Sequence, residues 1–113
     1  MKTRYFLTAA FISILATACG PVVDPQQIND ILALTGDSDN GLLLYRSQCQ
    51  LCHGVDGSGG VIGPDIRDAT ATYTDEALLT LFIGGRGNML PITFTNQQFA
   101  DVLVYVRATF GGG

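Results

Sequence analysis

Residues 49–53 read Cys-Gln-Leu-Cys-His, so two thiols and one imidazole lie within a single pentapeptide. The two cysteines are separated by about one helical turn, which lets both sulfur atoms reach the same object. The imidazole of His53 can offer one ring nitrogen to a metal while the other nitrogen holds a hydrogen-bond acceptor. The segment therefore predicts a site that holds one flat group by two covalent bonds and one coordinate bond.

The Cys-x-x-Cys-His pattern indicates covalent attachment of haem c. In this interpretation Cys49 and Cys52 form thioethers with the two vinyl groups on one edge of the porphyrin, and His53 binds the iron. We expect one covalent haem c in the chain.

Three other sites share the spacing of the two cysteines. A thioredoxin-type redox pair needs a βαβ pattern, and the chain has no alternating strand signal. A structural zinc site needs further ligands, but no second histidine exists and the third cysteine, Cys19, lies near the N-terminus. A disulfide across two residues is strained and leaves His53 without a role. Haem attachment uses all three side chains.

The chain begins like an exported protein. Lys2 and Arg4 precede an almost continuously apolar stretch over residues 5–16, which is too short to span a bilayer comfortably. Residues 15–19 read Leu-Ala-Thr-Ala-Cys and resemble the lipobox of bacterial lipoproteins. We predict a signal peptide over residues 1–18 and lipidation of Cys19, which would place the protein on the periplasmic side of a bacterial membrane. An ordinary signal peptidase site is the alternative, with Cys19 as the mature N-terminus.

Without residues 1–18 the chain keeps four arginines, no lysine and ten acidic side chains, a net charge of minus six. So acidic a surface is a poor ligand for phosphate backbones, which argues against nucleic acid as a partner. Solubility explains most of these carboxylates. For a redox partner we expect a basic or uncharged docking face.

Residues 19–38 predict a tether that contains one short helix. Asp24 can cap it, Pro25 suits its first position, and Ile28, Ile31 and Leu32 form an apolar stripe that ends before Gly36. We expect this helix to dock loosely on a domain formed by residues 39–113.

Within that domain the pattern predicts three helices. The first is capped by Asp39 or Asn40 and runs to Cys49. The second follows a Thr74 cap and ends at Gly84 with Gly85, and its predicted buried face holds Ala77, Leu78, Leu81 and Phe82.

The third helix follows Thr95, with Gln98 completing a capping box, and continues to Thr109 or Phe110. Between the first two helices, glycines crowd residues 54–63 and predict a loop that passes close to a flat, bulky group.

Residues 39–113 resemble class I cytochrome c domains. Gly41 and Tyr45 are similar to the family's glycine and aromatic pair, which packs across the final helix near Val102 and Tyr105. Residues 63–66, Gly-Pro-Asp-Ile, are similar to the family's Gly-Pro segment, in which the carbonyl of the proline, here Pro64, accepts a hydrogen bond from the proximal histidine. The resemblance implies an all-α cytochrome c fold, with three main helices and a short N-terminal helix around one covalently bound haem.

Met89 is the candidate for the sixth iron ligand. The processed chain has no second histidine, no lysine and no other methionine. Met89 lies between the second and third predicted helices, as the distal methionine does in the family, although Leu90 separates it from Pro91. A core methionine is the alternative. Arg86 is a candidate to hydrogen-bond a haem propionate, or is simply an exposed arginine.

With His53 and Met89 both bound, the iron has no vacant position, so the expected role is a carrier of single electrons and not an enzyme. A cytochrome subunit of a dehydrogenase or reductase complex would have the same haem site. A haem gas sensor would require Met89 to be unbound or easily displaced.

Overall fold

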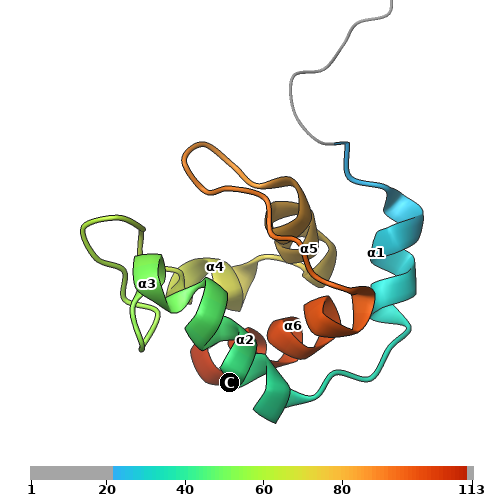
Figure 1. Cartoon of the computed structure of the whole chain (residues 1–113), viewed down its shortest axis with the longest axis horizontal. Coiled ribbons are helices and arrows are strands. Elements are labelled where there is room, and N and C mark those ends of the chain that lie inside the picture. The colour runs from blue at the N-terminus through green and yellow to red at the C-terminus, as the bar shows by residue number, and fades with distance from the viewer. Residues whose placement is uncertain (1–21, 112–113) are drawn as a thin grey trace, which may run out of the picture.

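The computed structural model describes residues 22–111, which are helical and contain no strand (Figure 1). In chain order the helices are α1 (Pro25–Leu32), α2 (Ser38–Gln48), α3 (Gln50–His53), α4 (Arg67–Thr72), α5 (Asp75–Gly84) and α6 (Asn96–Phe110). The all-α prediction is confirmed for this part of the chain. The predicted signal peptide and Cys19 lie outside the described residues.

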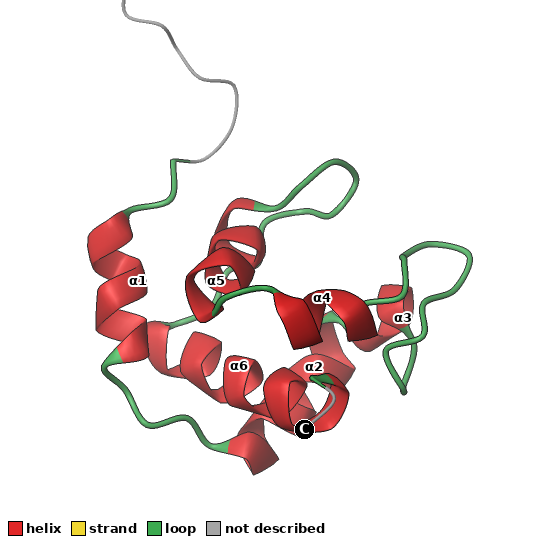
Figure 2. Cartoon of the chain, turned by 180° about the vertical axis from the view of Figure 1, so that it is seen from behind, coloured by secondary structure: helices red, strands yellow, loops and turns green. Residues whose placement is uncertain are grey.

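Helix α6 has the predicted bounds and supports most of the other helices (Figure 2). The Thr95 hydroxyl accepts a hydrogen bond from the Gln98 amide, and the Gln98 side chain accepts one from the Thr95 amide, so the capping box is present. Two apolar clusters form the core. Both include residues of α6, and the half-buried rings of Phe82 and Phe94 contact both of them.

Helix α2 begins two or three residues earlier than the sequence predicted. Its N-cap is Asp37, whose Oδ1 accepts hydrogen bonds from the amides of Asp39 at 2.9 Å and Asn40 at 3.2 Å. The prediction that Asp39 or Asn40 caps the helix is therefore wrong. Asp39 instead lies in the first turn, where a carboxylate meets the positive end of the helix dipole.

The crossing of α2 over α6 is close because Gly41 has no side chain. A Cβ at Gly41 would lie 2.1 Å from the Asp101 carbonyl oxygen and 2.6 Å from the Tyr105 Cβ. One turn further along α2, the ring of Tyr45 joins Val102 in a buried cluster on α6. The packing expected for this glycine and aromatic pair is confirmed.

Helix α5 has its predicted Thr74 cap, and Gly85 ends it with a φ of 70°. Its buried face differs from the prediction: Leu78 and Leu79 are buried, whereas Ala77 is exposed. Helix α4 was not predicted, because its sequence has no apolar period. Arg107 of α6 holds the α4–α5 connection, donating hydrogen bonds to the Thr70 and Tyr73 carbonyls and pairing with Asp75 at 2.8 Å.

Helix α1 is part of the core, so the expectation of loose docking is wrong. Asp24 caps the helix and Pro25 occupies its first turn, as predicted. Ile28 and Ile31 are buried in one cluster with side chains of α5 and α6: Leu78, Leu79, Phe99, Ala100 and Leu103. The division between a tether and a domain at residue 38 stays a prediction.

We predict that Ile31→Ala destabilises the protein by about 2–5 kcal/mol, because it leaves a cavity at a side chain that is 1% exposed. Urea unfolding of the haem-loaded protein measures this loss. Leu43→Ala is the matched control, since Leu43 is 60% exposed and its truncation should cost well under 1 kcal/mol. Equal losses in the two variants would show that α1 is not part of the cooperative unit.

A buried carboxylate joins α6 to the start of α2. Asp101 is 3% exposed and accepts hydrogen bonds from the Asp37 amide at 2.7 Å, the Asn40 side chain at 2.8 Å and the Gln97 side chain at 2.8 Å. Burial raises the pKa of Asp101, but these three hydrogen bonds together hold it below its ordinary value of 3.8. The ionised form is therefore the one that stabilises the fold.

We predict that Asp101→Asn lowers the free energy of unfolding at pH 7 by about 1–3 kcal/mol. Because the folded pKa is depressed, the wild-type advantage is complete above the ordinary pKa of 3.8 and disappears as pH falls through the folded pKa. Urea titrations between pH 7 and pH 2 test this, with Asp30→Asn on the outer side of α1 as control. A difference between wild type and Asp101→Asn that does not shrink on acidification would contradict the assignment.

Candidate haem-binding site

Helix α3 places the two thiols and the imidazole on one helical turn. The chain leaves α2 at Cys49, and the amides of Cys52 and His53 both donate to the Cys49 carbonyl, at 3.2 and 3.0 Å. Gly54 then ends the turn with a φ of 82°, a conformation that favours glycine. Both cysteine side chains are half-buried, and they form no disulfide with each other. The pentapeptide is thus a compact unit that presents its three reactive side chains together.

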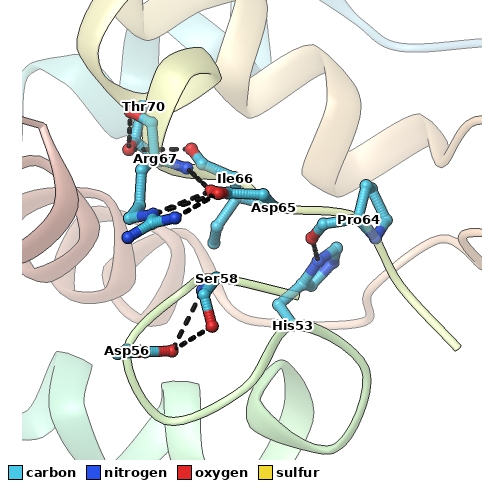
Figure 3. A network of polar contacts seen from close by, with 8 residues as sticks. All are labelled: His53, Asp56, Ser58, Pro64, Asp65, Ile66, Arg67 and Thr70. Atoms are coloured by element: carbon cyan, nitrogen blue, oxygen red, sulfur yellow. Dashed lines mark hydrogen bonds and ion pairs between the residues drawn. The ribbon is translucent and has the colours of Figure 1, made fainter. Parts of the chain in front are cut away.

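The imidazole of His53 is held by Pro64. Its Nδ1 lies 2.9 Å from the Pro64 carbonyl oxygen (Figure 3). A carbonyl only accepts, so Nδ1 donates the proton and Nε2 keeps a lone pair that can bind a metal. This is the contact that the resemblance to class I cytochromes c implied.

Pro64 reaches His53 because the loop between α3 and α4 folds back on α3. A Cβ at Gly63 would lie 2.6 Å from the Cys52 carbonyl oxygen, and a Cβ at Gly59 would lie 2.6 Å from the Asp65 amide nitrogen. Any larger residue at either position would push the loop away from α3. The glycine-rich composition therefore serves close contact of backbone with backbone, in addition to the contact with a flat group that the sequence suggested.

An exposed ion pair fixes the backbone that follows Pro64. The Arg67 guanidinium contacts both Asp65 carboxylate oxygens at 2.5–3.1 Å, and the Arg67 amide donates to the same carboxylate at 2.9 Å (Figure 3). Hydrogen bonding to Arg67 lowers the pKa of Asp65 to about 2. Sequence reasoning missed this pair, although a carboxylate two positions before an arginine at a helix start is a usable signal.

Met89 lies at the end of a tight turn in the connection between α5 and α6. The Arg86 amide donates to the Met89 carbonyl at 3.0 Å, and the Met89 amide donates to the Arg86 carbonyl at 2.9 Å. A Cβ at Gly85 would lie 2.6 Å from the Met89 carbonyl oxygen, so the turn is packed onto the end of α5. This loop extends beyond the end of α5, and the α3–α4 loop extends beyond α3 (Figures 1 and 2).

Arg86 lies at the rim of a hollow beside α5. Its other lining residues are Tyr73, Ala77, Thr80, Leu81 and Gly85. The wall is mainly apolar and carries one cation, which suits the edge of a porphyrin that bears a carboxylate. The expected role of Arg86 toward a haem propionate stays a prediction.

Apolar side chains that could line a haem differ in their burial. Leu78, Leu103 and Val106 are buried inside the two clusters of protein side chains, where they stabilise the core. Four others are half-buried and so keep some surface that a haem could contact: Ile66, Phe82, Ile92 and Phe94.

The donor set fits covalent haem better than the other sites considered. Within residues 22–111 no group of three or more histidine, cysteine, aspartate or glutamate side chains could hold a metal ion, which disfavours structural zinc. Burial, and then the charge of Cys52, raises the pKa of the Cys49 thiol to about 11. A thiol that stays protonated is a poor redox nucleophile. Two half-buried thiols beside an oriented imidazole match two thioethers and an iron ligand.

A sequence profile assigns the chain to a family. The profile described as "Cytochrome C oxidase, cbb3-type, subunit III" matches residues 36–106. The chain belongs to this family. It is a monohaem class I cytochrome c domain, it carries one covalently bound haem c, and cytochromes of this kind transfer electrons.

Individual relatives agree with this assignment. A cytochrome c-553-like protein of Synechocystis sp. is 29% identical over 85 residues, an alignment that covers 74% of this chain and 79% of the relative. Cytochrome cL from Hyphomicrobium denitrificans superposes with a TM-score of 0.53 at 27% identity, covering 62% of this chain and 45% of that one.

Cytochrome cL from Methylophaga aminisulfidivorans gives a TM-score of 0.54 at 22% identity, over 78% of this chain and 56% of that one, and supports the fold alone. This chain therefore matches about half the length of the two cytochromes cL.

Proposed function

We propose that this protein is an exported monohaem cytochrome that carries single electrons between periplasmic or membrane redox partners. The supporting observation is the hydrogen bond from His53 Nδ1 to the Pro64 carbonyl at 2.9 Å, because it leaves the other ring nitrogen free to bind iron. When bound, the haem supplies the Fe(II)/Fe(III) couple.

Six residues would hold the haem. Cys49 and Cys52 would form the thioethers, and His53 and Met89 would bind the iron. Pro64 would fix the His53 tautomer, and Arg86 would hydrogen-bond a propionate. The tight turn that ends in Met89 supports its assignment, since the turn is packed on Gly85 and limits where the thioether can move.

The half-buried aromatic rings of Phe82 and Phe94 join the two core clusters and would limit water near the iron. A methionine ligand and low solvent access both raise the reduction potential of a haem. With His53 and Met89 both bound to the iron, the site would exchange electrons and would not bind a substrate.

The proposal places the protein on the periplasmic side of a bacterial membrane, after removal of residues 1–18 and lipidation of Cys19. The basic start and apolar stretch of residues 1–18 support export. Within residues 22–111, no helix has the length and apolar character needed to cross a membrane. A lipid at Cys19 would keep the carrier close to membrane oxidoreductases and raise its effective concentration there.

A second candidate function is that of a cytochrome subunit attached to a dehydrogenase or reductase. It is favoured by the description of the matching family as an oxidase subunit. Apolar side chains exposed around the two loops would suit a lasting contact: Leu51, Val55, Val61, Ile62 and Leu90. Copurification with a larger redox subunit would support this function over a diffusing carrier.

The proposed ligands can be tested on protein exported from cells that are competent in haem attachment. We expect the intact mass to include one haem that survives acidic acetone, and the reduced wild type not to bind carbon monoxide. Met89→Ala opens one iron position, so it should bind carbon monoxide and have a lower reduction potential. Leu90→Ala, at the exposed neighbouring residue, should behave as wild type.

Colourless protein or extractable pigment would refute covalent haem. Carbon monoxide binding by the reduced wild type would favour the gas-sensor alternative. The same mass spectrum reports cleavage before Cys19 and acylation of its thiol.

The acidic surface predicts how partners dock. Since the processed chain has a net charge of minus six, reaction with a basic redox protein should slow as salt is added. Stopped-flow rates at increasing ionic strength measure this effect. Rates with acidic partners that are fastest at low salt would contradict it.

A further inference from the structure

The hydroxyl of Tyr45 makes a contact that the packing of its ring does not require. The side chain is 1% exposed, and its ring lies 5.5 Å from that of Tyr105 and 5.1 Å from that of Phe110, measured between centroids. A phenylalanine would fill the same space. The hydroxyl nevertheless reaches out of the cluster and donates a hydrogen bond of 2.6 Å to the Gly54 carbonyl.

Gly54 is the residue on which the chain turns directly after His53. It ends α3 with a φ of 82°, and its amide donates to the Gln50 carbonyl at 2.8 Å. The carbonyl of His53 accepts from the Gly59 amide, also at 2.8 Å. Rotation about the Gly54 backbone would therefore displace both the end of α3 and the loop that brings Pro64 to the imidazole.

We propose that Tyr45 is a positioning residue for His53: its hydroxyl fixes the Gly54 carbonyl and so keeps the imidazole aligned with Pro64. The inference deepens the proposed function and rests on it, because alignment matters only if His53 binds the haem iron. It links α2, which is packed on α6, to the residue after the proximal histidine by one hydrogen bond between a side chain and the backbone.

The environment of Tyr45 keeps its hydroxyl a donor. Burial is the largest cause that raises the pKa of Tyr45, to about 12, with smaller contributions from Cys49, Tyr105 and Asp56. The hydroxyl therefore stays protonated throughout the neutral range. The hydrogen bond to the Gly54 carbonyl is part-buried, so water competes with it less than with the same bond in solvent.

The test compares Tyr45→Phe with Tyr105→Phe in the haem-loaded full chain. Both variants remove one hydroxyl from the same aromatic cluster, so they are matched in packing. In Tyr45→Phe we expect exchange of the Gly54 and Gly59 amide hydrogens to accelerate by about 2- to 10-fold, the effect of losing one hydrogen bond.

We also expect the paramagnetically shifted His53 ring resonances of the ferric protein to move in Tyr45→Phe. Acid should displace His53 from the iron at a higher pH in this variant than in wild type. Tyr105→Phe should leave all three readouts unchanged. A purely structural role would lower the stability of Tyr45→Phe without moving the His53 resonances, and that result would overturn the proposal.

If Tyr45→Phe does not fold, a measurement on the wild type tests whether the Tyr45 hydroxyl donates to the Gly54 carbonyl. The hydrogen-bonded hydroxyl proton should produce a deuterium isotope shift on the Gly54 carbonyl carbon, and absence of that shift would overturn the proposal. Failure of the proposed function is distinguishable, because wild-type protein would then lack haem-shifted His53 resonances altogether.

Discussion

The structure depends on the close crossing of α2 over α6 at Gly41. With the Asp101 carbonyl 2.1 Å from where a Cβ would lie, no other residue permits this approach without displacing one helix. The crossing sets where α2 lies along α6 and how closely the two helices approach. It thereby fixes where Tyr45 enters the aromatic cluster, where α2 ends, and where Cys49 and α3 begin. The haem-attachment segment is therefore positioned by backbone contact between two helices, in addition to its contacts with the α3–α4 loop.

Two loops support the site, and each of them makes a close backbone contact at a glycine. Gly63 lets the α3–α4 loop touch the backbone of Cys52, and Gly85 lets the α5–α6 loop pack its Met89 turn on the end of α5. In each loop a backbone group lies close to another backbone group. One of these contacts adjoins His53, and the other adjoins Met89, the proposed second ligand.

The N-terminal helix α1 is also packed against the core, on the other side of α5 and α6 from the two loops. Burial of Ile31 in the same cluster as Leu79 joins α1 to α5, and the C-terminal end of α5 leads directly into the Met89 turn. If Cys19 is lipidated, the attachment to the membrane would act on a helix that belongs to the core.

The sequence by itself determined the class of cofactor and the caps of α5 and α6. The signal for haem attachment lies in five adjacent residues, 49–53, and the caps at Thr74 and Thr95 depend on hydrogen bonds that span three positions. Such signals are local, so they can be identified in the sequence without knowledge of the fold.

Only the tertiary structure decided that α1 is buried, that Asp37 rather than Asp39 caps α2, and that Tyr45 bonds to the Gly54 carbonyl. Burial of Ile31 requires partners that lie far along the chain. The Asp37 cap forms at the place where the Asp101 carboxylate of α6 accepts a hydrogen bond from the Asp37 amide. These outcomes depend on which surfaces pack together in the folded chain, and a local sequence pattern does not predict that packing.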